Sequence, residues 1–154
     1  MKMKQCLVVL VLCFLISPAF AAKLTSEIEL TRSIIQTEKQ AIIAKNMNFT
    51  EVEAQNFWPV YYDYQADLRK IGDRRVSLIM DYAKNYENMT NNQAEKILKD
   101  FIKNQKQKLS LQKSYIKKFK KVMPAMKVAR YFQLENKMDS VINVELAANI
   151  PLVR

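Results

Sequence analysis

Apolar and aromatic residues between positions 57 and 82 recur at alternating spacings of four and three residues. This is the repeat of a helix that packs along its length against other helices. The repeat consists of Phe57, Tyr61, Tyr64, Leu68, Ile71, Arg75, Leu78 and Tyr82. Arg75 is its one charged member. Pro59, near the start of the segment, is expected to kink the helix or to shift its start.

A second apolar stripe, in the C-terminal part of the chain, is also interrupted by one charge. Its apolar members are Val128, Tyr131, Met138 and Ile142. Glu135 lies between them. The two interruptions predict an ion pair between Arg75 and Glu135 on packed helices, which would fix the register more than it would add stability. The alternative is that both charges lie at the edge of the interface and stay solvated.

Two helix starts are marked by capping boxes, in which a Thr side chain accepts from the third helical N–H and a Glu or Gln side chain bonds back. Thr50 with Glu53, and Thr90 with Gln93, have this spacing. Pro124 suits a first helical turn, where its missing N–H costs nothing. The sequence predicts an all-α fold of four helices with a long central antiparallel hairpin. The expected helices are about Ser26–Lys45, Glu51–Asn85, Asn91–Val122 and Pro124–Ala148.

The N-terminal residues have the three parts of a secretory leader. Lys2 and Lys4 give a positive start, Leu7 to Ile16 an apolar stretch, and Ala19-Phe20-Ala21 a small-x-small cleavage site. No later segment reaches the roughly 18 apolar residues of a membrane span. We therefore expect residues 1–21 to be removed and residues 22–154 to form a single exported all-α domain without a transmembrane span.

Residue types that support most catalysis are absent from the chain after the leader. Cys6 and Cys13 lie within the leader, and the sequence has no histidine. This leaves no disulfide, no thiolate nucleophile, no cysteine-containing zinc site and no imidazole base. Gly72 is the only glycine, which excludes a glycine-rich phosphate loop. We expect a protein that is not an enzyme and holds no cofactor.

One methionine pair has a spacing known from soft-metal sites. Met123 and Met126 form an M-x-x-M pattern, and two thioethers can bind a soft metal ion. The alternative is that the pair fills the core.

Positive charge is concentrated in one part of the chain. Residues 94–130 contain twelve Lys and Arg against two Asp and Glu. Residues 104–108, in the middle of the expected helix Asn91–Val122, are all polar, so this part of that helix is expected to be exposed. We expect an exposed basic surface that binds anionic partners, formed largely by Lys99, Lys103, Lys106, Lys113, Lys117 and Lys120. The alternative is an ordinary solvated face. Nucleic acid is not expected, because the protein is exported and the segment has few arginines.

The segment Met89-Thr90-Asn91-Asn92-Gln93 resembles the L-T-x-x-Q motif of the periplasmic Spy/CpxP family, with Met in place of Leu. Phe49-Thr50-Glu51-Val52-Glu53 resembles a degenerate first copy that lacks both Leu and Gln. The resemblance covers most of residues 48–150. It implies a thin hooked helical hairpin, a homodimer and a periplasmic location. Members of that family are ATP-independent chaperones, modulators of envelope-stress sensors or metal-responsive proteins, and the absence of histidine argues against His-based metal sensing here.

Together these features predict an exported, non-catalytic protein that binds unfolded or acidic polypeptides in the manner of a chaperone. A second possibility is a partner-specific modulator of an envelope-stress sensor protein. A third is a surface protein that binds anionic lipid or polysaccharide. All three would bind more weakly at high salt.

Overall fold

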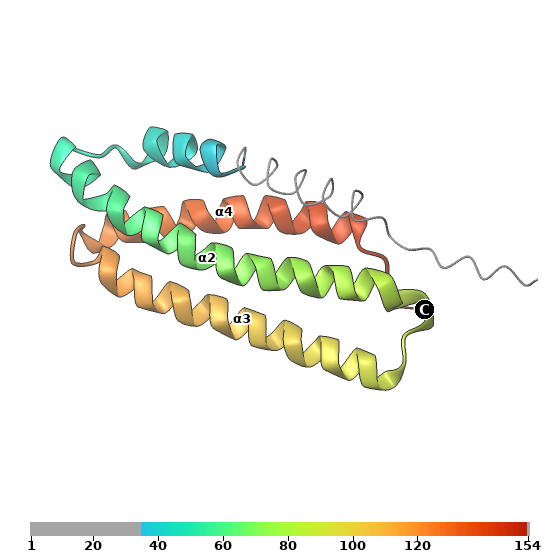
Figure 1. Cartoon of the computed structure of the whole chain (residues 1–154). Helices are drawn as coiled ribbons and strands as arrows, with labels where there is room; N and C mark the ends of the chain where they lie inside the picture. Colours follow the sequence, from blue (N-terminus) through green and yellow to red (C-terminus); the bar gives the residue numbers. More distant parts are fainter. Residues whose placement is uncertain (1–34, 154) are drawn as a thin grey trace, which may run out of the picture. The chain divides into compact units, whose positions relative to one another are not determined.

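The computed structural model describes residues 35–153, and all regular structure in that range is helical (Figure 1). A helix is described over residues 35–47. It is followed by α2 (Glu51–Asn85), a short 3₁₀ helix η1 (Tyr86–Asn88), α3 (Asn91–Phe119) and α4 (Ala125–Asn149). The all-α fold predicted from the sequence is confirmed. The expected leader and the expected start of the first helix lie outside the described residues.

The described helix boundaries agree with those predicted to within three residues. α2 has the predicted bounds, and Pro59 lies inside it without shifting its start. α3 ends at Phe119, three residues before the expected Val122. The backbone N–H groups of Lys121 and Val122 bond to the carbonyls three residues back, those of Lys118 and Phe119, at 3.1 and 3.0 Å, so the chain tightens into a turn here instead of continuing as an α-helix. Helical geometry is disfavoured for the residue before a proline. Pro124 is the N-cap residue of α4, so this helix begins at Ala125, one residue after the expected start.

Both predicted capping boxes are present. Thr50 accepts from the N–H of Glu53 at 3.3 Å, and Glu53 accepts from the N–H of Thr50 at 2.9 Å. Thr90 and Gln93 make the same pair of bonds at 3.3 and 2.9 Å. Each box satisfies two backbone donors that a helix start leaves without partners, so the start of each helix is determined locally.

Helices α2 and α3 form a long antiparallel hairpin, and α4 runs beside them parallel to α2 (Figure 1). The antiparallel direction follows from contacts at two levels, since Gln93 donates to Asn85 at 3.3 Å and Asn104 donates to the Ile71 carbonyl at 3.0 Å. The parallel direction of α4 follows from two ties to α2, from Lys127 to Glu53 near the start and from Tyr82 to the Pro151 carbonyl near the end.

The core lies in one half of this bundle and is built largely of aromatic rings. Its buried members are Ile43, Met47, Phe57, Tyr61, Tyr64, Tyr115, Phe119, Met123, Val128 and Tyr131. Ring centroids lie 5.3 Å apart for Phe57 and Phe119 and 4.8 Å apart for Phe119 and Tyr131. The other half, made of residues 72–110 and the described side chains after Glu135, contains no fully buried residue. The chain divides into two units after Gln40, and the bundle belongs to the second unit.

Candidate functional site

All six lysines predicted to form a basic surface are exposed on α3 or at its C-cap. They are Lys99, Lys103, Lys106, Lys113, Lys117 and Lys120. Successive residues of a helix are rotated by about 100°, so the spacings between these lysines confine them to an arc of roughly 100°. They therefore form one row along the helix. We call this row the lysine face.

Within the described residues, the lysine face lacks the ion pairs that two other lysines of α3 make. Other lysines of the same region have carboxylate partners: Lys96 pairs with Asp100 at 3.2 Å, and Lys108 with Asp139 of α4 at 2.6 Å. In the part of the chain that the structure describes, none of the six lysines has an ion pair with a carboxylate. Their positive charge is thus available to an external partner.

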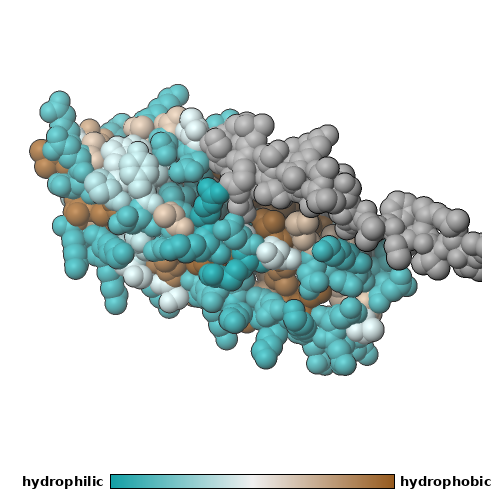
Figure 2. All heavy atoms as spheres, viewed as in Figure 1, coloured by the Kyte–Doolittle hydropathy of each residue, from teal (hydrophilic) through white to brown (hydrophobic). Residues whose placement is uncertain are grey.

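Exposed apolar side chains lie next to the lysine face, and the sequence analysis did not anticipate them there. Leu98, Ile102 and Leu109 are 63%, 49% and 52% exposed. Figure 2 shows that hydrophilic side chains cover most of the visible face, with smaller hydrophobic areas between them. The signal was present in the sequence as a spacing of four and then seven residues. It was missed because the segment from Asn104 to Lys108 separates these positions and is polar.

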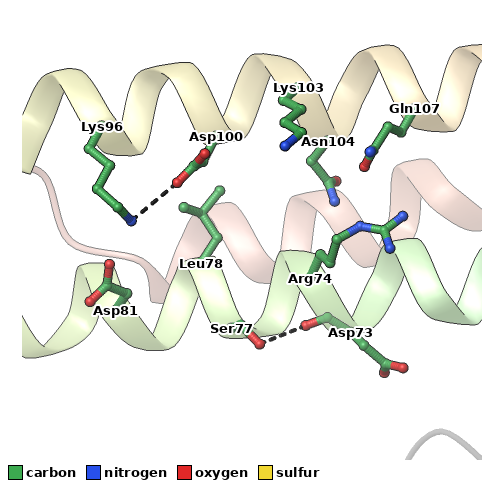
Figure 3. Close-up of a pocket in the computed structure, with 10 residues that line it drawn as sticks. All are labelled: Asp73, Arg74, Ser77, Leu78, Asp81, Lys96, Asp100, Lys103, Asn104 and Gln107. Carbon is green, nitrogen blue, oxygen red and sulfur yellow. Dashed lines mark hydrogen bonds and ion pairs between the residues drawn. The ribbon is translucent and has the colours of Figure 1, made fainter.

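A cleft of about 530 Å³ lies between α2 and α3, and its charges balance each other (Figure 3). Its charged lining residues are three acidic and three basic side chains: Asp73, Asp81, Asp100, Arg74, Lys96 and Lys103. Figure 3 shows Lys96 already engaged with Asp100 across one turn of α3. Because the lining is close to neutral, the cleft does not single out an anionic or a cationic ligand.

The predicted ion pair between Arg75 and Glu135 is not formed. Glu135 is only 1% exposed, and its Oε1 accepts hydrogen bonds from Gln65 at 3.0 Å and from the Tyr131 hydroxyl at 3.1 Å. Arg75 is half-buried, and the structure of residues 35–153 records no ion pair or hydrogen bond for its side chain. The solvated alternative also fails for Glu135, which is buried.

The direction of α4 explains this correction. α2 and α4 run parallel, and Glu135 lies level with Gln65 on α2. Ten residues of helix separate Gln65 from Arg75, a rise of about 15 Å. Arg75 is therefore too far along α2 to reach Glu135. The two interrupted apolar stripes correctly predicted that α2 and α4 pack together, but not the axial register between these helices.

Four tyrosines and two carboxylates have shifted pKa values whose causes are local. Burial, together with the negative charge of Glu135, raises the pKa of Tyr131 far above its usual range. Burial and a 2.8 Å hydrogen bond to Asp67 raise the pKa of Tyr115 to about 12. Burial also raises the pKa values of Tyr61 and Tyr64. These tyrosines therefore stay neutral at physiological pH.

The two carboxylates have lowered pKa values. The hydrogen bond from Lys70, followed by that from Tyr115, lowers the pKa of Asp67. The hydrogen bond from Lys127, followed by that from the Thr50 backbone, lowers the pKa of Glu53. Both carboxylates are therefore charged at neutral pH and tie together parts of the chain that are distant in sequence.

The two methionines of the M-x-x-M pattern have different surroundings. Met123 is buried in the core, whereas Met126 is 86% exposed. The core-filling alternative thus holds for Met123 alone. Within residues 35–153, no group of three or more His, Cys, Asp and Glu side chains is placed to hold a metal ion.

Over the same described residues, no helix has the length and apolar character needed to cross a membrane. Comparison with protein-family models, curated proteins and solved structures found no match for this chain. The site is therefore interpreted from its own geometry: an uncompensated row of lysines beside a row of exposed apolar side chains.

Proposed function

We propose that this protein is an exported, non-catalytic binder of polypeptides that acts in the manner of a chaperone in the cell envelope. The observation that carries the proposal is the lysine face with Leu98, Ile102 and Leu109 exposed beside it. A surface with both features matches segments in which acidic and apolar residues occur together. Such segments are common in chains that have not yet buried their apolar residues.

The two parts of the surface act over different ranges. Unpaired lysines attract an acidic chain over distances up to the screening length, which is about 10 Å at 0.1 M salt. Each exposed lysine contributes little by itself, so the row acts as a group. The apolar side chains gain free energy only on contact, at about 25 cal/mol per Å² of apolar surface removed from water. A partner that covers these three half-exposed side chains removes little apolar surface from water, which favours weak and reversible binding.

Two features of the sequence support the proposed location of the protein and its proposed relation to chaperone-like proteins. The N-terminal segment has the composition of a cleaved leader, and Met89-Thr90-Asn91-Asn92-Gln93 resembles the L-T-x-x-Q motif of Spy/CpxP proteins. N-terminal sequencing of the exported protein tests the first feature. A mature chain beginning at Ala22 is expected, and an intact N-terminus would contradict export with cleavage.

Charge reversal on α3 tests the binding function. In Lys106→Glu/Lys113→Glu/Lys117→Glu, association with a reduced, unfolded acidic protein should slow markedly at low salt, because steering depends on the summed charge. Helix content, measured by circular dichroism, should stay nearly unchanged because the three positions are exposed. The matched control is Lys45→Glu/Lys84→Glu/Lys137→Glu, which makes the same change in net charge at exposed lysines elsewhere. Equal binding by both variants would show that the lysine face is an ordinary solvated surface without a role in binding.

Further assays separate the proposal from its two alternatives. Suppression of aggregation of an unrelated client supports a chaperone-like protein. Capture of a single envelope sensor without aggregation suppression would replace it with a partner-specific modulator. Binding to anionic vesicles or polysaccharide, with none to polypeptides, would replace it with a surface-associated protein.

A further inference from the structure

One side of α3 contains a heptad repeat whose apolar members, except Ile116, lie outside the aromatic core. Its positions follow spacings of four, three, four, three and four residues, which is the repeat of a coiled-coil interface. They are Leu98, Ile102, Gln105, Leu109, Gln112 and Ile116. We call this row the outer seam. Ideal helix geometry keeps all six positions within roughly 80° of one another around the axis.

The outer seam borders the face by which α3 packs against its neighbours and shares Ile116 with it. The inward side contains Tyr115 and Phe119, which are buried, and Asn104, which bonds to the Ile71 carbonyl of α2. Three of the four apolar members of the outer seam are exposed, and Ile116 is half-buried. An open hollow along this side has Leu98 and Ile102 in its lining. Within the described residues, the seam is therefore open at Leu98, Ile102 and Leu109, whereas Ile116 packs against the core and Gln112 lines a hollow that α4 shares.

The charge beside the outer seam has the same seven-residue period. Lys99, Lys106 and Lys113 each follow a position of the repeat on the same flank, and Lys120 continues their seven-residue spacing. In a coiled coil, residues at flanking positions pair with charges on the other helix and set partner choice. All four of these lysines are exposed. This flank thus presents a cation at every heptad.

The opposite flank is turned toward the protein's own helices. Lys108 pairs with Asp139 of α4, and the hydroxyl of the buried Tyr115 donates to Asp67 of α2. Phe101, on the same flank, is exposed and widens the apolar row near the start of the seam. An incoming helix would therefore meet charge on one side only, and that charge is uniformly positive.

We propose that the outer seam docks an α-helix of a partner protein that presents an apolar stripe with acidic side chains at seven-residue intervals along one flank. This proposal rests on the proposed polypeptide-binding function and narrows its partner class to acidic amphipathic helices. From Leu98 to Ile116 the seam is about 27 Å long, enough for a partner of about 20 residues. Gln105 and Gln112 interrupt the apolar row, so the affinity is modest and a partner with polar side chains opposite them fits best.

The same features disfavour the other occupants of such a face. If a second copy of this chain packed antiparallel through the outer seam, lysine flanks would meet, and like charges in contact are destabilising. An anionic bilayer would attract the lysines, but inserting the seam would bury the amides of Gln105 and Gln112 in an apolar phase, which costs free energy. A partner helix with acidic side chains opposite the lysines and polar side chains opposite Gln105 and Gln112 avoids both the charge repulsion and the burial of unpaired amides.

Two synthetic helices of equal composition test the proposal on the full protein. The register peptide has about three heptads, an apolar stripe and glutamate at every seventh position of one flank. In the shuffled peptide, the glutamates are moved to the side away from the stripe. Three flank pairs of ordinary exposed strength predict about tenfold tighter binding of the register peptide, measured by fluorescence anisotropy at low salt. Equal affinity for the two peptides would overturn the proposal.

Variants of the protein test the seam itself. Ile102→Gln/Leu109→Gln should weaken binding of the register peptide about tenfold or more, because it removes apolar contact at two exposed positions. The matched control is Val141→Gln/Val144→Gln, at two exposed apolar positions of α4, and it should not change binding. The variant Lys99→Glu/Lys106→Glu/Lys113→Glu should no longer bind the register peptide. It should instead bind a version of that peptide with lysines in place of the glutamates. Failure of this charge exchange would also overturn the proposal.

The outcomes distinguish this inference from the proposed function. If acidic unfolded clients bind but the register peptide has no advantage, the seam proposal fails and the polypeptide-binding function stands. If neither unfolded clients nor peptides bind, both fail. A dimer in sedimentation that is lost in Ile102→Gln/Leu109→Gln would assign the seam to a second copy instead. Seam-dependent binding to anionic vesicles without peptide binding would assign it to a membrane surface.

Discussion

The hydroxyl of Tyr131 donates a 3.1 Å hydrogen bond to the carboxylate of Glu135, one helical turn further along α4. Both side chains are buried, and the same carboxylate oxygen accepts from Gln65 of α2 at 3.0 Å. A charged side chain in an aromatic core is costly unless its oxygens are hydrogen-bonded. The Tyr131–Glu135 pair therefore holds a polar link between α2 and α4 at the edge of the core.

Removing Glu135 should destabilise the fold more than removing Arg75. Glu135→Ala leaves the buried Tyr131 hydroxyl and the Gln65 amide without this acceptor, and we expect a loss of about 2–3 kcal/mol in the free energy of unfolding. Glu135→Gln keeps an acceptor oxygen and should lose less. Arg75→Ala should cost no more than about 0.5 kcal/mol. Urea denaturation of the three variants measures these differences.

A double-mutant cycle separates the observed contact from the one predicted by sequence. Gln65 and Glu135 should show a coupling energy, whereas Arg75 and Glu135 should be additive because no interaction joins them. Coupling between Arg75 and Glu135, with none between Gln65 and Glu135, would mean that the register between α2 and α4 is different in solution.

The capping box of α3 should contribute measurably to stability. Thr90→Ala removes the hydroxyl that accepts from the Gln93 N–H, and the expected loss is about 1 kcal/mol in the free energy of unfolding. Thr90→Ser keeps the hydroxyl and serves as the control. Thr50→Ala should behave similarly at the start of α2. A Thr90→Ala protein as stable as the parent would show that the box contributes nothing net.

The contact between Glu53 and Lys127 should make stability depend on acidic pH. Lys127 lowers the pKa of Glu53 in the folded state below its value in the unfolded chain. The contact therefore stabilises the fold fully above the pKa of Glu53 in the unfolded chain, near 4.5. This stabilisation is lost as the pH falls through the lower pKa of Glu53 in the folded protein. Glu53→Gln keeps an acceptor for the capping box, as Gln93 does in α3, but removes the charge. The variant should be less stable than the parent at pH 7, and this difference should shrink by pH 3. A constant difference in urea midpoint at both pH values would contradict the assignment.

Hydrogen exchange should divide the bundle into two halves. All fully buried side chains of the bundle lie at the level of Phe57 to Ile71 of α2 and Tyr115 to Phe119 of α3. Opening a helix costs less where few apolar contacts are lost, so amides of residues 96–106 should exchange faster than those of residues 113–119. Measurement by mass spectrometry or NMR checks this. Equal protection along α3 would show that the half without a buried core is stabilised in another way.

The helices and their ends were determined by local chemistry, and the sequence alone was sufficient to predict them. A capping box involves residues three positions apart, so Thr50 and Thr90 marked the starts of α2 and α3. The basic face was equally accessible, because lysine spacing along one helix fixes which of them share a side. The end of α3 differed most, since the turn before Pro124 takes three more residues than expected.

The tertiary structure decided which faces are buried and which residues meet between helices. α3 has apolar residues on two sides, and its sequence does not state that Tyr115 and Phe119 face the core while Leu98, Ile102 and Leu109 stay exposed. The partner of Glu135 likewise depends on the axial position of α4 beside α2. That position is set by the packing of large aromatic side chains from several helices at once, a property of the assembled core that no single helix encodes.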